Sequence, residues 1–139
     1  MSKIKGIYVD LNVSRCKLAI HRVWSYRKES YEVHRFNHKI EVLRKVIKIL
    51  ADSEIDYLSK FEEFDEEEFT STPGRKRRFI SREKSGLYPR SPHLADKHSF
   101  EQNGFWIATN FGQGGIMRSL RRICKSADLR FGHVMEIDI

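Results

Sequence analysis

Apolar and polar positions alternate along the start of the chain, most regularly over Ile7–Val13. Successive side chains of a strand point to opposite faces, so this alternation predicts a strand over Lys3–Val13. The next segment has two interpretations. Ser14 is a suitable cap for a helix over Arg15–Trp24, and a strand over Lys17–Trp24 fits almost as well. Residues 25–37 are mixed in character and are predicted to form a connection.

Helical spacing of apolar residues dominates the next part of the chain. Apolar positions recur every three or four residues over His38–Ala51, with basic residues between them, which predicts an amphipathic helix. Ser53 is predicted to cap a second helix, because Asp56 occupies the capping-box position three residues on. That helix is expected to turn Ile55, Tyr57 and Leu58 inward.

An acidic run, Asp65–Glu68, follows. Carboxylates complement the helix dipole at an N-terminus, so the run fits the first turn of a third, short helix. Consecutive carboxylates usually form a solvated face. We therefore expect this run to point away from any surface that binds a polyanion.

The second half of the chain is predicted to contain one more strand and one more helix. Pro73 and Gly74 end the helical region. Residues 82–100 are polar and read as a long ordered loop, with a single helical turn near Ser81–Leu87. Phe105–Thr109 is rich in β-prone residues, and Ile116–Lys125 has one apolar face and one basic face. The predicted fold class is α+β, with a small antiparallel sheet and helices packed on it.

Composition changes this picture through charge. The chain has 139 residues and a net charge of +7. Residues 1–68 are formally neutral, so the whole excess lies in residues 69–139. A localised basic excess is suited to a polyanion, since binding phosphates releases condensed counterions. Cys16 and Cys124 show no metal-ligand spacing, and no apolar run reaches membrane-spanning length, so a cytoplasmic protein is expected.

Two turns carry the candidate chemistry. In an extended Arg75–Arg78 segment, Arg75 and Arg77 project to one face, and paired guanidiniums match phosphate oxygens or the major-groove edge of guanine. The second turn, Asn110–Gly115, joins the predicted strand to the basic helix. Its asparagine amide can pair with adenine, as can the Gln113 amide, and the free amides at the helix start offer an anion site. We predict that the two turns lie side by side.

At these residues the chain resembles the C-terminal DNA-binding domain of the SeqA family, the bacterial negative modulators of replication initiation. The Gly74–Arg77 motif and the Phe105–Asn110 motif with Gly114 carry the resemblance, which covers roughly two thirds of the chain. It implies binding of hemimethylated GATC in duplex DNA. Arg75 and Arg77 would hold the backbone and flanking bases. Thr109 and Asn110 would read the methylated base pair.

The sequence thus predicts a non-catalytic, nucleoid-associated protein that binds double-stranded DNA, reads a methylated or hemimethylated site and regulates replication. No cofactor or metal is expected. Residues 38–139 would form the DNA-binding domain, and residues 1–37 a strand and helix appendage compatible with a homo-oligomer. The predicted DNA-binding residues are Arg75, Lys76, Arg77, Thr109, Asn110, Phe111, Gly112, Gln113 and Arg118.

Two other functions stay open. A small metal-dependent nuclease would use the loop that contains His93, Asp96, His98 and Glu101, although their spacing fits no recognised ligand pattern. An RNA-binding or protein-interaction module would use Trp106 and Phe111 to stack bases or to dock a partner.

Overall fold

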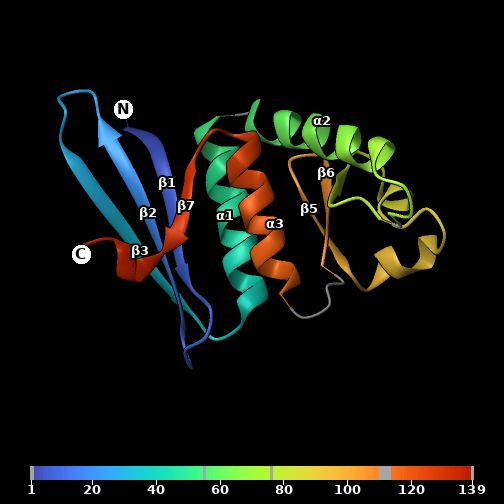
Figure 1. Cartoon of the computed structure of the whole chain (residues 1–139), viewed down its shortest axis with the longest axis horizontal. Coiled ribbons are helices and arrows are strands. Elements are labelled where there is room, and N and C mark those ends of the chain that lie inside the picture. The colour runs from blue at the N-terminus through green and yellow to red at the C-terminus, as the bar shows by residue number, and fades with distance from the viewer. Residues whose placement is uncertain (1, 55, 76, 110–113, 139) are drawn as a thin grey trace.

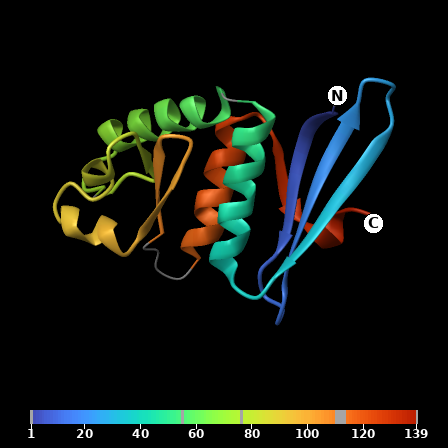
Figure 2. The ribbon, with the colours of Figure 1, turned by 180° about the vertical axis from the view of Figure 1, so that it is seen from behind.

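The computed structural model describes residues 2–54, 56–75, 77–109 and 114–138. Within them the chain forms three layers (Figure 1). A four-stranded sheet lies at one end, helices α1 (Lys39–Ser53) and α3 (Gly115–Ser126) form the middle, and a three-stranded sheet with helix α2 (Asp56–Ser71) lies at the other end. The view from behind shows α1 between the two sheets (Figure 2). The predicted α+β class is confirmed.

The larger sheet is mixed rather than antiparallel. Its strand order is β3-β2-β1-β7, with β1 (Ser2–Asp10), β2 (Cys16–Trp24) and β3 (Glu29–Phe36) joined antiparallel. Strand β7 (Arg130–His133) comes from the other end of the chain and lies parallel to β1. The final described segment contains a 3₁₀ turn, η3 (Val134–Glu136).

Two sequence interpretations of this region are corrected. Residues 16–24 form strand β2, so the strand alternative was right and the helix was wrong. Residues 29–36, predicted as a connection, form strand β3. The β3 strand lies at the sheet edge and buries none of its side chains fully, so its sequence lacks the alternation of apolar and polar residues that marked β1.

The smaller sheet is antiparallel, in the order β4-β6-β5. It contains β4 (Ile80–Ser81), β5 (Ser99–Gln102) and β6 (Phe105–Ala108). The predicted strand over Phe105–Thr109 is confirmed as β6. The loop before β5 holds two short 3₁₀ helices, η1 (Lys84–Gly86) and η2 (Pro92–Asp96), and the first of them is the predicted helical turn.

The helices differ from prediction at their ends and in number. The first and last predicted helices are confirmed as α1 and α3. Ser53 ends α1 instead of capping α2, and the acidic run continues α2 to Ser71 instead of starting a third short helix there. The second helix buries Tyr57 and Leu58 as expected, whereas Ile55 lies outside the described residues.

One large hydrophobic cluster joins all three layers. It contains Ile7 and Leu18 from the larger sheet, Ile47 from α1, and Ile107 from the smaller sheet, each with almost no exposed surface. The cluster crosses the predicted boundary between residues 37 and 38, and β7 completes a sheet that the first 37 residues begin. Phe79 and Ile80 belong to this cluster, so the end of the segment that follows α2 is anchored in the core.

Candidate nucleic-acid interface

The acidic run of α2 interacts with the basic segment that follows it. Asp65 is fully buried and forms an ion pair with Arg75. Its second carboxylate oxygen accepts hydrogen bonds from the backbone N–H groups of Phe79 and Ile80, at 2.7 and 3.3 Å. The prediction that the whole run is a solvated face was therefore wrong for Asp65. One carboxylate instead fixes the course of the chain from α2 into β4.

Arg75 consequently has an internal role. Its guanidinium pairs with Asp65, also donates to the Asp65 carbonyl oxygen at 3.3 Å, and leaves 11% of the side chain exposed. Gly74, just before it, has a φ of +81°, a left-handed conformation that suits glycine and makes the turn out of α2. The Asp65 carboxylate therefore compensates the positive charge of Arg75, which was predicted to hold a DNA phosphate.

Three guanidinium groups surround one aromatic ring beside this pair. Those of Arg75, Arg77 and Arg122 lie 5.1, 5.6 and 5.1 Å from the centre of the Phe79 ring. Such cation–π contacts orient the guanidiniums without neutralising them. Arg122, on α3, also pairs with Glu68 of the acidic run. Phe79 therefore anchors basic side chains from two distant parts of the sequence.

Arg77 lies close to two other cations, Arg75 and Arg118. Burial lowers the pKa of Arg77. The nearby Tyr88 hydroxyl opposes this, and the positive charges of Arg118 and Arg75 lower that pKa further. The guanidinium stays protonated at neutral pH, because arginine does not lose its proton in proteins. A bound anion at this point would reduce the repulsion among the three cations.

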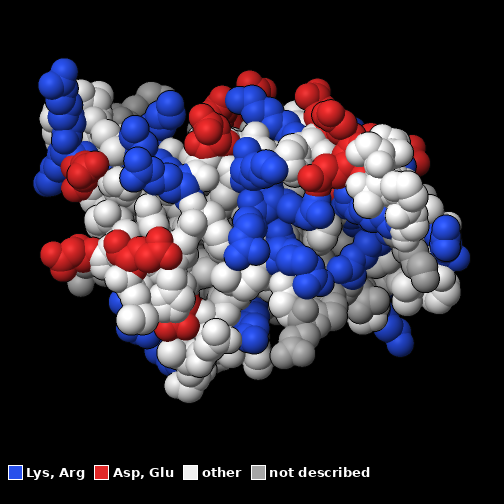
Figure 3. Space-filling view, in the orientation of Figure 1, with Lys and Arg blue, Asp and Glu red and all other residues white. Residues whose placement is uncertain are grey.

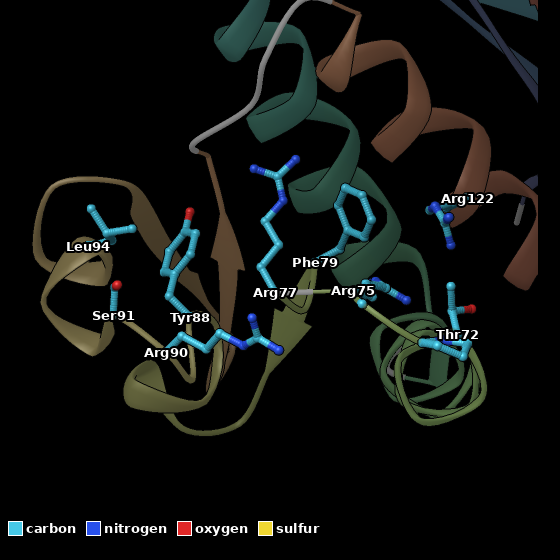
Figure 4. A pocket seen from close by; sticks show the side chains of 11 residues that line it. Thr72, Arg75, Arg77, Phe79, Tyr88, Arg90, Ser91, Leu94 and Arg122 are labelled. Carbon is cyan, nitrogen blue, oxygen red and sulfur yellow. The ribbon is translucent and has the colours of Figure 1, made fainter.

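The arginine pocket, as we call it, opens in front of this cluster. It has a volume of about 670 Å³ and lies between residues 72–79, the Tyr88–Leu94 segment and α3 (Figure 4). Four arginines line it together with apolar and aromatic walls, and no carboxylate belongs to its described lining. The arginines are Arg75, Arg77, Arg90 and Arg122.

A basic stripe on α3 continues from the pocket. Arg121 and Arg122 each lie three or four residues from both Arg118 and Lys125, so the four side chains share one side of the helix. The same four side chains line a second, smaller hollow with Phe64 and Glu68. Since Arg122 belongs to both hollows, seven basic side chains and one carboxylate line the two together.

The basic surface can be seen directly. Lys and Arg gather over α3 at the centre of one face, and Asp and Glu lie along the α2 side above them (Figure 3). Glu62, Glu63, Glu66 and Glu67 line a separate hollow of α2. Apart from Asp65 and Glu68, the acidic part of α2 therefore lies away from the arginine pocket. We call the arginine pocket and the α3 stripe together the basic face.

The structure brings together some of the predicted site residues. Arg77 lies in the pocket and Arg118 is close enough to influence its pKa. Thr109 lies at the end of β6 and lines another hollow, with Asn12, Lys39 and Gly114. Lys76, Asn110, Phe111, Gly112 and Gln113 lie outside the described residues. That the arginine segment and the Asn110 turn lie side by side therefore stays a prediction, because the turn lies outside the described residues.

Sequence reasoning missed several residues of this surface. Arg121, Arg122 and Lys125 belong to the basic face predicted for the Ile116–Lys125 helix, but of that face only Arg118 was included among the predicted DNA-binding residues. Arg90 stands alone in a polar loop, and no local pattern marks it. The rival nuclease loop shows no corresponding cluster: among the described residues, no three His, Cys, Asp or Glu side chains are placed to hold a metal. No helix in the described ranges is long and apolar enough to cross a bilayer.

Comparison of the chain with protein-family models, curated proteins and solved structures finds no significant match. The resemblance to the SeqA family therefore remains a prediction from the two quoted motifs.

Proposed function

We propose that this chain binds duplex DNA, without cleaving it, through the basic face. The observation that supports this most is the seven-to-one excess of basic over acidic side chains in two adjoining hollows. A protein that binds phosphates gains most of its affinity from such a localised excess. The carboxylates of Asp65 and Glu68 each pair with an arginine at the edge of this surface. They therefore fix the positions of these arginines and add little exposed negative charge.

The α3 stripe supplies a repeated series of phosphate contacts. From Arg118 to Lys125 the helix rises roughly 10 Å, at about 1.5 Å per residue, which approaches the width of a DNA groove. Arg118, Arg121 and Lys125 are exposed, so their charges are accessible to a ligand. In this proposal Arg77 adds a further contact from the pocket, and Arg75 positions the segment that carries it.

The finer part of the proposal is that the chain reads a methylated or hemimethylated site. Through this site it regulates replication or senses DNA modification. It rests on the SeqA resemblance, which assigns base reading to Thr109 and Asn110. A binding selection over unmodified, hemimethylated and fully methylated duplexes tests this discrimination separately from the overall affinity for DNA.

The test of DNA binding removes charge from the stripe. The double variant Arg121→Ala/Lys125→Ala should bind a labelled duplex roughly tenfold more weakly at low salt, because two cations no longer reach DNA phosphates. Its plot of log affinity against log salt concentration should be shallower by about 0.9 for each phosphate that is no longer neutralised. Fluorescence anisotropy at several salt concentrations measures both quantities.

Arg35→Ala is the matched control, since Arg35 is exposed on β3, outside the basic face. It should retain the affinity and the salt slope of the parent. A double variant that binds like the parent, or an Arg35→Ala variant whose affinity falls as much, would contradict the assignment of the interface to α3.

A further inference from the structure

The outermost strand of the larger sheet, β3, has one open edge. It pairs with β2 along one side, and none of the described strands pairs with its other side (Figures 1 and 2). With eight residues it is the longest edge strand that the structure describes, because β7 and β5 have four residues each and β4 has two. The backbone N–H and C=O groups along this edge can therefore pair with another strand.

Strand β3 has few of the features that keep edges from pairing. Pro, Gly and Lys, which commonly protect an edge, do not occur in Glu29–Phe36, and the pairing with β2 continues without a bulge. The carboxylate near its centre, Glu32, is compensated by Arg22 at 3.4 Å and by His34 at 2.6 Å. Val33 is 44% exposed, and it alone among the exposed large apolar residues of the described ranges lies in a strand. This edge is therefore suited to pairing.

The sequence of β3 is complementary to itself in one antiparallel register. In that register Val33 lies opposite Val33 of a second copy, so two exposed apolar side chains meet. On either side of this pair, Glu32 lies opposite His34, and Tyr31 lies opposite Arg35. A carboxylate opposite an imidazole stabilises a strand pair, and no like charges face each other.

Other registers lose this complementarity. A shift by two residues places Glu32 opposite Glu32, or His34 opposite His34, depending on its direction. Like charges directly across a strand pair are destabilising. A shift by one residue pairs the core-facing side of one copy with the outer side of the other. The pattern of side chains therefore selects both the partner and the register.

We propose that two copies of this chain associate through β3, antiparallel and centred on Val33. A two-fold axis passes between the two valines, and the two four-stranded sheets join into one continuous sheet. The partner is a second copy because the edge complements its own side chains. The inference is independent of DNA binding, since no residue of β3 lines the hollows of the basic face.

Disulfide cross-linking tests the register. Val33→Cys places two thiols beside the axis, where the Cβ atoms of opposite residues are about 5 Å apart. Mild oxidation should therefore join two copies, as seen by electrophoresis without reductant. Arg35→Cys is the matched control, because Arg35 is exposed on the same side of β3. Its two thiols would lie roughly 13 Å apart, at about 3.4 Å per residue, so no disulfide should form. Cys16 and Cys124 are buried in both variants.

Sedimentation velocity measures the association itself. As the concentration rises, the parent should approach twice the mass of one chain. Val33→Lys should stay at the mass of one chain, because it places two ammonium groups opposite each other. Val13→Lys is the matched control, since Val13 is equally exposed, at 45%, and lies in the turn between β1 and β2. It should associate like the parent.

Three results would overturn the proposal. The first is a parent that sediments as one chain at every concentration. The second is a Val33→Lys variant that associates like the parent. The third is a disulfide that forms as readily in Arg35→Cys as in Val33→Cys. Each of them leaves the test of duplex binding unaffected, because that test concerns α3.

Discussion

At the scale of single residues, Asp65 has the greatest structural consequence. It stands first in a run of four acidic residues, and nothing in the run distinguishes it from its neighbours. The fold buries it completely and gives it one guanidinium and two backbone N–H groups. A buried carboxylate is stable only with such partners, so the side chain and the turn that surrounds it depend on each other.

Asp65→Ala should destabilise the protein by about 3–5 kcal/mol, because it leaves Arg75 and two backbone amides without their partner. Urea unfolding followed by circular dichroism measures the change. Glu67→Ala is the control, since Glu67 is exposed on the same helix, and it should alter stability by no more than about 0.5 kcal/mol. Equal stability of the two variants would show that the buried pair contributes little.

At the scale of elements, helix α2 has one side in the protein interior and one side facing solvent. Its inward side contributes Phe61 and Asp65 to the interior, and its outward side carries glutamates. Glu66 accepts a hydrogen bond from Arg78 at 2.5 Å, next to the cation–π contact of Arg78 with Phe69. This ion pair holds the segment before β4 against the exposed side of α2. The Asp65–Arg75 pair holds the same segment against the buried side of the helix.

The Glu66–Arg78 pair predicts a dependence of stability on pH. The hydrogen bond from Arg78 holds the pKa of Glu66 below its ordinary 4.5. A lowered pKa in the folded state contributes stability above pH 4.5, and that stability is lost as the pH falls through the lowered pKa. The gap between the parent and Glu66→Gln should therefore be present at pH 7 and shrink as the pH falls below 4.5.

Melting temperatures between pH 7 and pH 3 measure this gap. Its size at pH 7 should stay below about 1 kcal/mol, because the Glu66 side chain is 48% exposed and solvent screens the pair. Glu67→Gln provides the comparison and should follow the parent at every pH. A gap for Glu66→Gln that does not change with pH would exclude an ionic origin.

At the scale of the whole molecule, segments from opposite ends of the sequence lie in one sheet. The first strand, β1, pairs with the last strand, β7, and one hydrophobic cluster extends from the larger sheet through α1 and α3 to the smaller sheet. Shared burial of this kind couples the unfolding of the layers. We therefore expect residues 1–37 to unfold together with the remainder of the chain.

The two tryptophans report on this coupling independently, because Trp24 lies in β2 and Trp106 lies in β6. The variants Trp24→Phe and Trp106→Phe each leave one fluorescent probe in one sheet. Within each variant, the fluorescence transition in urea should coincide with the circular dichroism transition, as expected for a single two-state unfolding. A Trp24 signal that changes before the circular dichroism signal would indicate an independently folding N-terminal segment.

Local patterns in the sequence were enough to predict several of the helices and strands. Helices α1 and α3 place apolar residues at a regular spacing, so their inward faces could be predicted, and β6 is a run of β-prone residues. The basic excess of residues 69–139 is likewise a property of composition alone. Of the basic face, Arg75, Arg77 and Arg118 were predicted directly.

Only the tertiary structure decided the remaining features, since they depend on contacts between distant segments. Strand β3 exists because β2 offers it backbone partners, although its own sequence has no clear period. Asp65 is buried because Arg75 and the amides of Phe79 and Ile80 reach it. Arg90 and Arg122 line one pocket although they are 32 positions apart in the sequence. Burial and ion pairing are set by which chain segments come together, and a single sequence records no such distances.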